Sequence, residues 1–220
     1  ADWRGCNVTI PHKLAAMELV DEIDEAAARV GAANCLFYDR GRLVATNTDV
    51  IGIGEALAQT LVDQPVCLIG AGGAARAALV AAYVLGASDI RLMLRDPAKG
   101  ERLLAELGMY GRVFGLDDAP DAYDGAAVVI NASPLGMVGS PAMPSVLLDE
   151  LELLRPGALV FDMVYAPLET ALLARARSLG LATVDGLTML IGQAGEAFRH
   201  FFGIAAPRER DAELRMLLGG

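Results

Sequence analysis

Short apolar runs alternate with stretches of helical spacing over residues 66–184. The apolar runs predict buried strands at 66–69, 90–94, 128–131, 159–163 and 182–184. Apolar positions at helical spacing predict helices at 74–85, 97–107 and 170–179. Apolar strands that alternate with helices are typical of a parallel sheet covered on both faces. This region therefore predicts a large α/β domain.

The first 65 residues follow a different pattern. They predict a strand at 6–10, a helix at 14–30 that ends at Gly31, and a hairpin of 34–38 and 42–45 around Asp39-Arg40-Gly41. Further helices are expected at 49–62, 187–202 and 208–218. We therefore predict a smaller, N-terminally incomplete α/β domain of residues 1–48 that is completed by the C-terminal helices within 187–220. Residues 49–186 then form the larger domain.

Composition narrows the class of protein. Of the 220 residues, 54% are hydrophobic and 21% charged, which is typical of a soluble globular chain. The net charge of −10 argues against nucleic acid or an anionic membrane as partner, although a local basic pocket could still bind an anionic small molecule. No apolar run reaches the length of a membrane span.

Cysteine and histidine positions add two expectations. The cysteines, Cys6, Cys35 and Cys67, are few and odd in number, which fits a reducing cytoplasm better than a disulfide framework. His12 and His200 share no metal-ligand spacing with each other or with the cysteines, so no metal site is expected.

A glycine-rich turn lies between the predicted strand at 66–69 and the helix that follows. It reads Gly70-Ala71-Gly72-Gly73-Ala74-Ala75, the Gly-x-Gly-x-x-Ala pattern of dinucleotide sites. Gly70 permits the tight turn, Gly72 admits a pyrophosphate, and the small Ala75 lets the helix pack on the sheet. The alternative is a strand–turn–helix without ligand, but the flanking elements favour a Rossmann-like dinucleotide-binding domain with cofactor contacts from Gly70, Ala71, Gly72, Gly73 and Ala74.

The end of the second strand bears on the choice of cofactor. NAD sites place an acidic residue there for the ribose 2′-hydroxyl, whereas here Arg95 follows the strand and Lys99 comes one helical turn later. Two cations suit a 2′-phosphate, so the sequence favours NADP. Asp96 keeps NAD open, because its carboxylate could neutralise Arg95 or accept from a ribose hydroxyl.

Candidate acid–base groups gather in the first fifty residues. Reduction of a ketone needs a proton donor at the oxygen, and Lys13 could serve if it lies beside Asp49. A protonated lysine donates directly to a developing alkoxide, so the donor role is better supported than a role as base. Considered alone, Lys13 could equally be solvated, and Asn47-Thr48-Asp49 could be a helix N-cap.

Seven motifs occur in the order found in the shikimate dehydrogenase family, and the chain resembles that family over nearly its whole length. They are Gly5-Cys6-Asn7-Val8-Thr9-Ile10-Pro11-His12-Lys13, Gly31-Ala32-Ala33-Asn34, Asn47-Thr48-Asp49, the glycine turn, Asn131-Ala132-Ser133-Pro134-Leu135-Gly136-Met137, Asp162-Met163-Val164-Tyr165-Ala166-Pro167, and Asp185-Gly186-Leu187-Thr188-Met189-Leu190-Ile191-Gly192-Gln193-Ala194.

The resemblance implies a two-domain enzyme that reduces 3-dehydroshikimate to shikimate with NADPH, as a monomer or homodimer. It implies Lys13 and Asp49 as the catalytic pair, and the smaller domain as the substrate-binding domain. Substrate contacts are expected from Thr9, Lys13, Asn34, Asp49, Tyr165 and Gln193. Further cofactor contacts are expected from Arg95, Lys99, Asn131, Ser133, Met137, Met163 and Gly186. Of these, Met163 and the residues of the loop 131–137 match the side of the family's site that faces the nicotinamide ring.

Four departures from the family pattern keep alternatives open. The Ser-x-Ser pair near the family's N-terminus is absent, and the chain starts at Ala1 inside a motif, so we expect a missing upstream segment. Cys35 replaces a common Thr, Val50 replaces a common Gly, and Leu94-Arg95-Asp96 replaces Asn-Arg-Thr. An NAD-preferring quinate/shikimate dehydrogenase, an aminoshikimate-directed relative and a non-catalytic dinucleotide-binding module remain alternatives.

Overall fold

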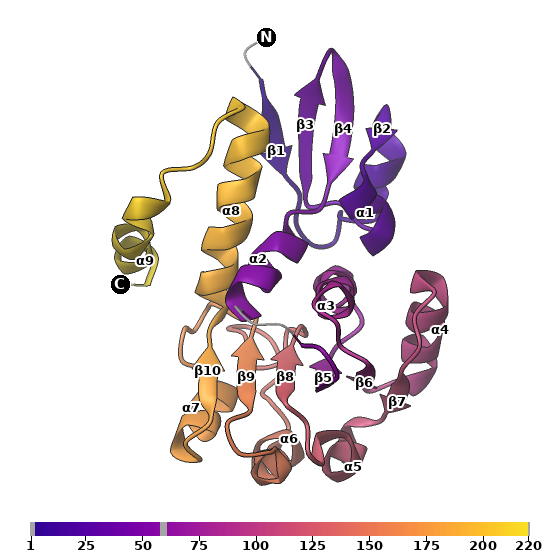
Figure 1. The fold of residues 1–220 in the computed structure, drawn as a ribbon, viewed down its shortest axis with the longest axis vertical. Helices are drawn as coiled ribbons and strands as arrows, with labels where there is room; N and C mark the ends of the chain where they lie inside the picture. The colour runs from indigo at the N-terminus through magenta and orange to yellow at the C-terminus, as the bar shows by residue number, and fades with distance from the viewer. Residues whose placement is uncertain (1–2, 58–60, 220) are drawn as a thin grey trace.

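A six-stranded parallel sheet forms the larger half of the molecule in the computed structural model, which describes residues 3–57 and 61–219 (Figure 1). The strand order is β10-β9-β8-β5-β6-β7, and every neighbouring pair runs parallel. The strands are β5 (Pro65–Ile69), β6 (Asp89–Met93), β7 (Arg112–Phe114), β8 (Val128–Asn131), β9 (Leu159–Asp162) and β10 (Ala182–Val184).

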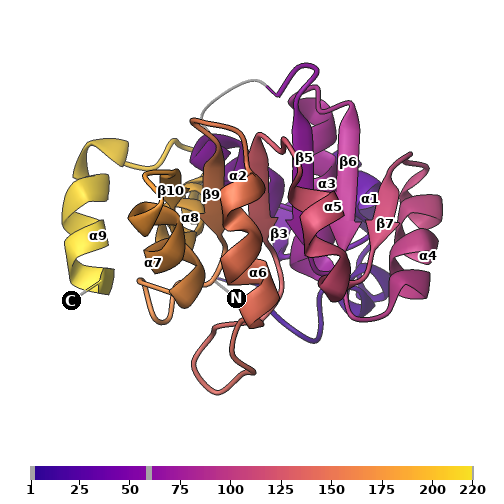
Figure 2. The same cartoon turned by 90° about the horizontal axis from the view of Figure 1, so that it is seen from below.

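Alternate residues of each strand point to opposite faces of this sheet, so both faces carry apolar side chains, and helices cover both. Val66 and Leu68 of β5 pack with α3 (Gly73–Val84) and α4 (Pro97–Leu107). Cys67 and Ile69 of β5 face the opposite layer, which Figure 2 shows from below. That layer consists of η2 (Leu116–Asp118), α5 (Ala119–Tyr123), α6 (Ser145–Asp149), η3 (Glu150–Leu153) and α7 (Ala171–Ser178). The predicted doubly covered α/β sheet is confirmed.

A four-stranded sheet forms the smaller half, in the order β1-β3-β4-β2. Its strands are β1 (Gly5–Asn7), β2 (Glu22–Ile23), β3 (Cys35–Asp39) and β4 (Arg42–Thr46). The predicted hairpin is confirmed, since Asp39 pairs with Arg42 across a two-residue loop. Arg40 and Gly41 in that loop have φ of 47° and 80°, as a right-twisted two-residue hairpin requires.

The single helix predicted over 14–30 is wrong. The segment contains η1 (Ala15–Leu19), then β2, then α1 (Glu25–Val30). Asp21 is bound to β4, where Leu43 N–H donates to its carboxylate at 2.8 Å and Leu43 O accepts its N–H at 2.9 Å. Asp24 then starts α1 by accepting from Ala27 N–H at 2.8 Å. Parallel pairing of β2 with β4 therefore overrides the helical spacing.

The remaining helices lie between or beside the two sheets. The helix predicted over 49–62 is shorter: α2 spans Asp49–Leu57, residues 58–60 lie outside the described part, and 61–64 are not helical. α8 (Gly186–Phe202) runs from the large sheet to the small one (Figure 1), followed by η4 (Arg208–Arg210) and α9 (Asp211–Gly219). α2 packs on both α8 and α3, so the boundary at residue 48 stays a prediction.

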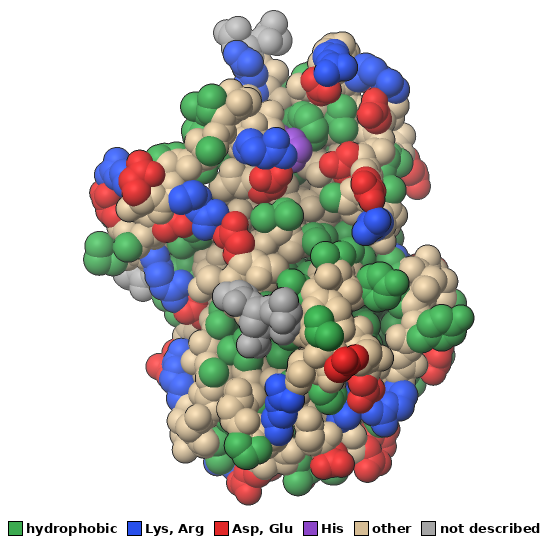
Figure 3. Space-filling view, viewed as in Figure 1, with side chains coloured by type: hydrophobic (Ala, Val, Ile, Leu, Met, Phe, Trp, Pro, Cys, Tyr) green, Lys and Arg blue, Asp and Glu red, His purple; other side chains and the backbone are tan. Residues whose placement is uncertain are grey.

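The surface carries mixed charge. On the face shown in Figure 3, acidic and basic side chains are interspersed over both halves. Within the part of the chain that the structure describes, no helix is long and apolar enough to cross a membrane.

Candidate active site

Backbone hydrogen bonds bring three separate segments together at one end of the small sheet. Val8 N–H donates to Asn34 O at 2.7 Å, and Ala33 N–H donates to Lys13 O at 2.7 Å. Asn34 N–H in turn donates to Thr46 O at 3.1 Å. The segments 8–13, 33–34 and 46–49, which hold most of the predicted polar residues, thus meet at one place.

Lys13 and Asp49 form a largely buried ion pair at that place. Lys13 Nζ lies 2.5 Å from Asp49 Oδ2, and their side chains are 13% and 2% exposed. The other carboxylate oxygen, Oδ1, accepts from Asn34 Nδ2 at 2.7 Å. Asn34 Nδ2 also lies 2.8 Å from Gln193 Oε1, so one amide connects the ion pair to α8. The structure therefore joins four of the predicted residues in a single network.

Two buried residues before α2 hold Asp49 in place, and the sequence indicated them only as a helix cap. Asn47 Nδ2 donates to Ala32 O at 2.8 Å, while its Oδ1 accepts from Asp49 N–H at 3.1 Å. Thr48 N–H donates to Asn34 Oδ1 at 2.7 Å. The first turn of α2 is thus fixed to the segment that carries Asn34, and the Asp49 carboxylate lies at a helix N-terminus that favours its charge.

Two glycines set the distance between α2 and α8. A Cβ at Gly52 would lie 2.5 Å from Met189 O and 2.9 Å from Gln193 N, and a Cβ at Gly192 would lie 3.0 Å from Gly52 Cα. Only hydrogen fits at this crossing. The close approach lets Asn34 reach Asp49 on α2 and Gln193 on α8 at once.

Substitution of Gly52 tests this crossing. Gly52→Ala should lower stability by about 1–3 kcal/mol, because its methyl group meets backbone atoms that cannot move aside. Gly54→Ala is the matched control in the same helix: a Cβ there meets nothing within 4 Å, so removal of a helical glycine should stabilise by about 0.5–1 kcal/mol. Thermal unfolding midpoints measure both. Equal shifts in the two variants would contradict a tight α2–α8 crossing.

The ion pair lies against the glycine turn of the large domain. A Cβ at Gly73 would lie 3.3 Å from Lys13 Cδ and 3.7 Å from Lys13 Cβ. The aliphatic part of Lys13 therefore crosses from the small sheet to the first residue of α3. Lys13 and Gly73 are 60 positions apart in the sequence, yet the acid–base pair and the predicted dinucleotide turn form one site.

The glycine turn fits a pyrophosphate. Gly70 has φ of 120°, and a Cβ there would lie 3.0 Å from Ala132 O, so no side chain is tolerated. A Cβ at Gly72 would meet nothing within 4 Å, which leaves open space above the turn. Gly72 is also the N-cap of α3 and supplies no side-chain oxygen, so the first N–H groups of a 12-residue helix are left for an anion.

The structure leaves both predicted 2′-phosphate contacts available. Arg95 and Lys99 are exposed, at the end of β6 and in the first turn of α4. Neither has an ion-pair partner among the described residues. Asp96 occupies the N-cap position of α4 without a side-chain cap bond, so it remains an acceptor near the same place.

The loops at the carboxyl ends of β8 and β9 hold the predicted ring-side residues. Ser133 and Met163 are half-buried, and Met137 is 41% exposed. Asn131 is fully buried, and its amide contacts Ser133 and other protein groups. Its side chain therefore supports the loop and does not line an open surface. A Cβ at Gly186 would lie 2.3 Å from Met163 O, so α8 begins directly against β9.

Two predicted substrate residues are exposed in loops. Tyr165 is 54% exposed in the loop after β9. Thr9 is exposed in the turn that leads to Lys13, where its carbonyl accepts from His12 N–H at 2.9 Å. Both side chains are therefore free to meet a ligand, unlike Asn34 in the interior.

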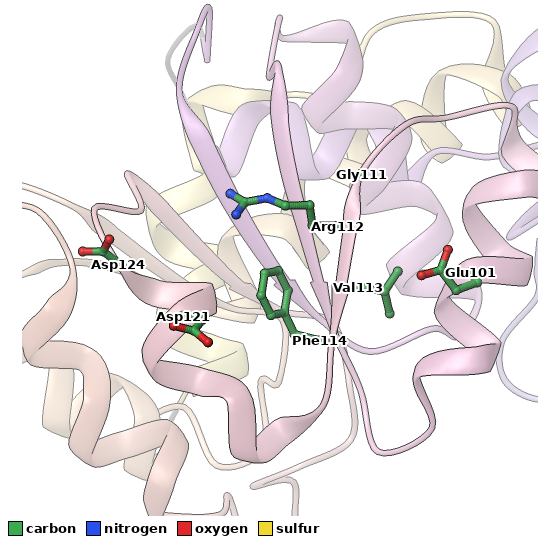
Figure 4. Close-up of a pocket in the computed structure, with 7 residues that line it drawn as sticks. All are labelled: Glu101, Gly111, Arg112, Val113, Phe114, Asp121 and Asp124. Carbon is green, nitrogen blue, oxygen red and sulfur yellow. The ribbon is translucent and has the colours of Figure 1, made fainter.

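A separate cavity of about 660 Å³ opens beside the edge strand β7 (Figure 4). It is lined by Glu101, Gly111, Arg112, Val113, Phe114, Asp121 and Asp124. None of the predicted site residues lines it, and β7 lies two strands away from β5 and the glycine turn.

Across residues 3–57 and 61–219, no group of three or more His, Cys, Asp or Glu side chains is placed to hold a metal ion.

Two features together define the class of dinucleotide-dependent oxidoreductases. The first is a parallel α/β domain whose glycine turn has no side-chain cap, and the second is a buried Lys–Asp pair that lies against this turn. The family model described as "Shikimate dehydrogenase substrate binding domain" matches residues 1–36. The shikimate dehydrogenase (NADP(+)) of Sphingopyxis alaskensis is 45% identical over 218 residues, which cover 98% of this chain and 77% of that protein. That of Rhodospirillum rubrum is 43% identical over 225 residues, covering 98% and 78%. The chain belongs to the shikimate dehydrogenase family.

Solved structures agree with this assignment. Shikimate 5-dehydrogenase from Thermus thermophilus, in complex with NADP(H) and shikimate, has a TM-score of 0.81 at 32% identity, covering 98% of this chain and 79% of that one. Quinate dehydrogenase from Corynebacterium glutamicum, in complex with NAD, has a TM-score of 0.85 at 31% identity, covering 98% and 78%.

Proposed function

We propose that this chain is an NADP-dependent dehydrogenase that interconverts 3-dehydroshikimate and shikimate in aromatic amino acid biosynthesis. The observation that carries the proposal is the Lys13–Asp49 ion pair at 2.5 Å, with the Lys13 stem against Gly73 of the dinucleotide turn. The names of relatives that are 43–45% identical over 98% of the chain support the reaction and its cofactor.

Two groups of residues in the large domain would hold the dinucleotide. Gly70, Gly72 and the start of α3 would accommodate the pyrophosphate, and Arg95 with Lys99 would bind the 2′-phosphate. When bound, the reduced dinucleotide supplies the hydride for the carbonyl carbon.

Lys13 supplies the proton in the reduction. Negative charge develops on the substrate oxygen as the carbonyl is reduced, and the Lys13 ammonium donates its proton to that oxygen. Asp49 holds the ammonium in place through the buried ion pair. In the oxidation direction the proton returns to neutral Lys13, or reaches Asp49 through a water molecule.

The remaining polar residues would bind the hydroxyl and carboxylate groups of the substrate. We assign Asn34 and Gln193, which are joined at 2.8 Å, to the floor of the site, and the exposed Thr9 and Tyr165 to its rim. Because the Asn34 amide is engaged by Thr48, Asp49 and Gln193, it would orient the Gln193 amide, whose NH₂ group would donate to a substrate hydroxyl. We place the small-domain part of this site within residues 1–48 and 187–220, and the dinucleotide part within 49–186.

An NAD-preferring quinate/shikimate dehydrogenase is the second candidate. Asp96 at the end of β6 and the likeness to the quinate dehydrogenase support it. A non-catalytic binding module is disfavoured because Lys13 and Asp49 are both present and in contact. We further propose that the chain acts in the cytoplasm as a monomer or homodimer, with no nucleic acid or membrane partner.

Initial rates in four pairings of substrate and cofactor separate these candidates. Shikimate and quinate are each oxidised with NADP⁺ and with NAD⁺, and reduction of the nicotinamide is followed by absorbance. We expect the highest kcat/KM with shikimate and NADP⁺. Equal or better rates with NAD⁺ would contradict the cofactor assignment, and dinucleotide binding without turnover on either substrate would favour the binding module.

A further inference from the structure

A fully buried carboxylate lies at the carboxyl edge of the large sheet and has no role in the proton transfer. Asp162 is the last residue of β9, and its register partner Asn131 is the last residue of β8. Both are 0% exposed. Asn131 Nδ2 donates to Asp162 Oδ1 at 2.9 Å, so the two strand ends are joined through side chains as well as through the backbone.

Two further donors complete the shell of Asp162. Val164 N–H donates to Oδ1 at 3.0 Å, and the Thr170 hydroxyl donates to Oδ2 at 2.7 Å. Leu173 N–H donates to the Thr170 hydroxyl oxygen at 3.3 Å, which directs the hydroxyl proton toward Asp162. Among the described residues, no Lys, Arg or His forms an ion pair with Asp162.

The three donors around position 162 favour a side chain that only accepts hydrogen bonds. Burial raises the pKa of the Asp162 carboxyl, and the hydrogen bonds from Thr170, Val164 and Asn131 act in the opposite direction. Because all three partners donate, the carboxylate satisfies every bond, whereas an amide would turn an NH₂ group toward one of the donors. Burial of this charge is unfavourable, and the three donors offset that cost by satisfying the carboxylate oxygens.

The Asp162 shell connects the two loops that carry the ring-side residues. The first loop, 132–138, follows β8 and is held by Asn131, whose Oδ1 accepts from Ser133 N–H at 3.1 Å. The second loop, 163–169, follows β9 and ends at Thr170. Val138 N–H donates to Ala166 O at 2.9 Å, so the two loops also bind each other.

We propose that Asp162 is a positioning residue that fixes both loops against the nicotinamide end of the dinucleotide. The inference rests on the proposed function, since the loops matter to catalysis only if Ser133, Met137, Met163 and Tyr165 face the cofactor and substrate. Asp162 itself touches neither; it acts through Asn131 and Thr170.

Asp162→Asn tests the proposal, with Asp89→Asn as the matched control. Asp89 begins β6 at the opposite end of the sheet, where it binds Arg91 and Arg112. Its substitution removes the same charge without contact to either loop. We expect Asp162→Asn to raise the Kd and KM for NADP⁺ about tenfold, the scale of one lost charge-assisted hydrogen bond. Asp89→Asn should lower thermal stability but leave the Kd and KM for NADP⁺ within about twofold of the wild-type values.

Amide hydrogen exchange gives a readout that does not depend on turnover. Exchange in 132–138 and 163–169 should accelerate in Asp162→Asn and stay unchanged in Asp89→Asn. If Asp162→Asn does not fold, Thr170→Val and Thr170→Ser replace it: Val should show the same effects and Ser should restore wild-type values. Unchanged NADP⁺ affinity and unchanged loop exchange in the folded variant would overturn the proposal. An inactive wild-type chain would instead count against the proposed function, and the Kd and exchange comparison would still decide the role of Asp162.

Discussion

Replacement of Lys13 by alanine should lower kcat by about 10²–10⁴-fold, the usual contribution of a general acid, while the Kd for NADPH changes little. The reason is geometric. Lys13 Nζ is committed to Asp49 at 2.5 Å, and only its aliphatic stem lies against Gly73. The glycine turn itself keeps its N–H groups and its open space when the side chain is removed. Steady-state kinetics and a fluorescence titration with NADPH measure the two effects separately.

Two further variants make this result specific. Lys13→Met keeps most of the stem against Gly73 but lacks the ammonium, so it should be as slow as Lys13→Ala. His12→Ala changes the exposed neighbouring residue and should retain wild-type kcat. An alanine variant that turns over at the wild-type rate would remove Lys13 from the mechanism.

Joint replacement of Arg95 and Lys99 by alanine should raise the KM for NADPH by about 10²-fold, because each cation makes a charge-assisted bond to the 2′-phosphate. The KM for NADH should change little, since that cofactor lacks the phosphate. The two side chains are exposed and without ion-pair partners in the described part of the chain, so no internal contact is lost. Kinetics with both cofactors in both proteins give the comparison.

Arg102→Ala is the matched control for this pair. Arg102 lies on the same helix, α4, and is also exposed, but it is further from the end of β6. Its loss should leave both KM values unchanged. An equal rise with NADPH and NADH in the double variant would show that the cations serve the shared part of the dinucleotide, and would contradict the NADP assignment.

Much of the large domain could be predicted from the sequence because its signals are local. α4, β8 and β10 have the predicted boundaries, β5 and β9 differ by one residue at one end, and β6 is shifted by one residue at both ends. Most of these strands are short, mainly apolar runs, and α4 lies between Asp96-Pro97 and Gly108. Short elements such as β7 and α5 were missed because three to five residues carry too little periodicity.

The failures came where distant residues decide the local structure. The 14–30 segment has helical spacing, yet Asp21 and Glu22 bind β4, a strand about twenty residues away. Its conformation therefore depends on a parallel pairing that no local window contains.

Only part of the site could be predicted, again because contacts between distant residues decide which side chains meet. The family resemblance pointed to Lys13 and Asp49, and the structure places them in contact. The Gly52–Gly192 crossing and the Asp162 shell were not predicted, because a glycine in a helix and an aspartate at a strand end give no signal until the neighbouring element is known. The roles of the individual contact residues remain predictions.

A crystal structure of this chain with NADP⁺ and shikimate would show whether Lys13 faces the reacting group. We expect Lys13 Nζ to lie within about 3 Å of the shikimate hydroxyl that is oxidised, still paired with Asp49. The pyrophosphate should lie over Gly72 at the start of α3. A shikimate bound away from Lys13 would contradict this mechanism, and so would a nicotinamide ring on the side of the glycine turn that faces away from Lys13.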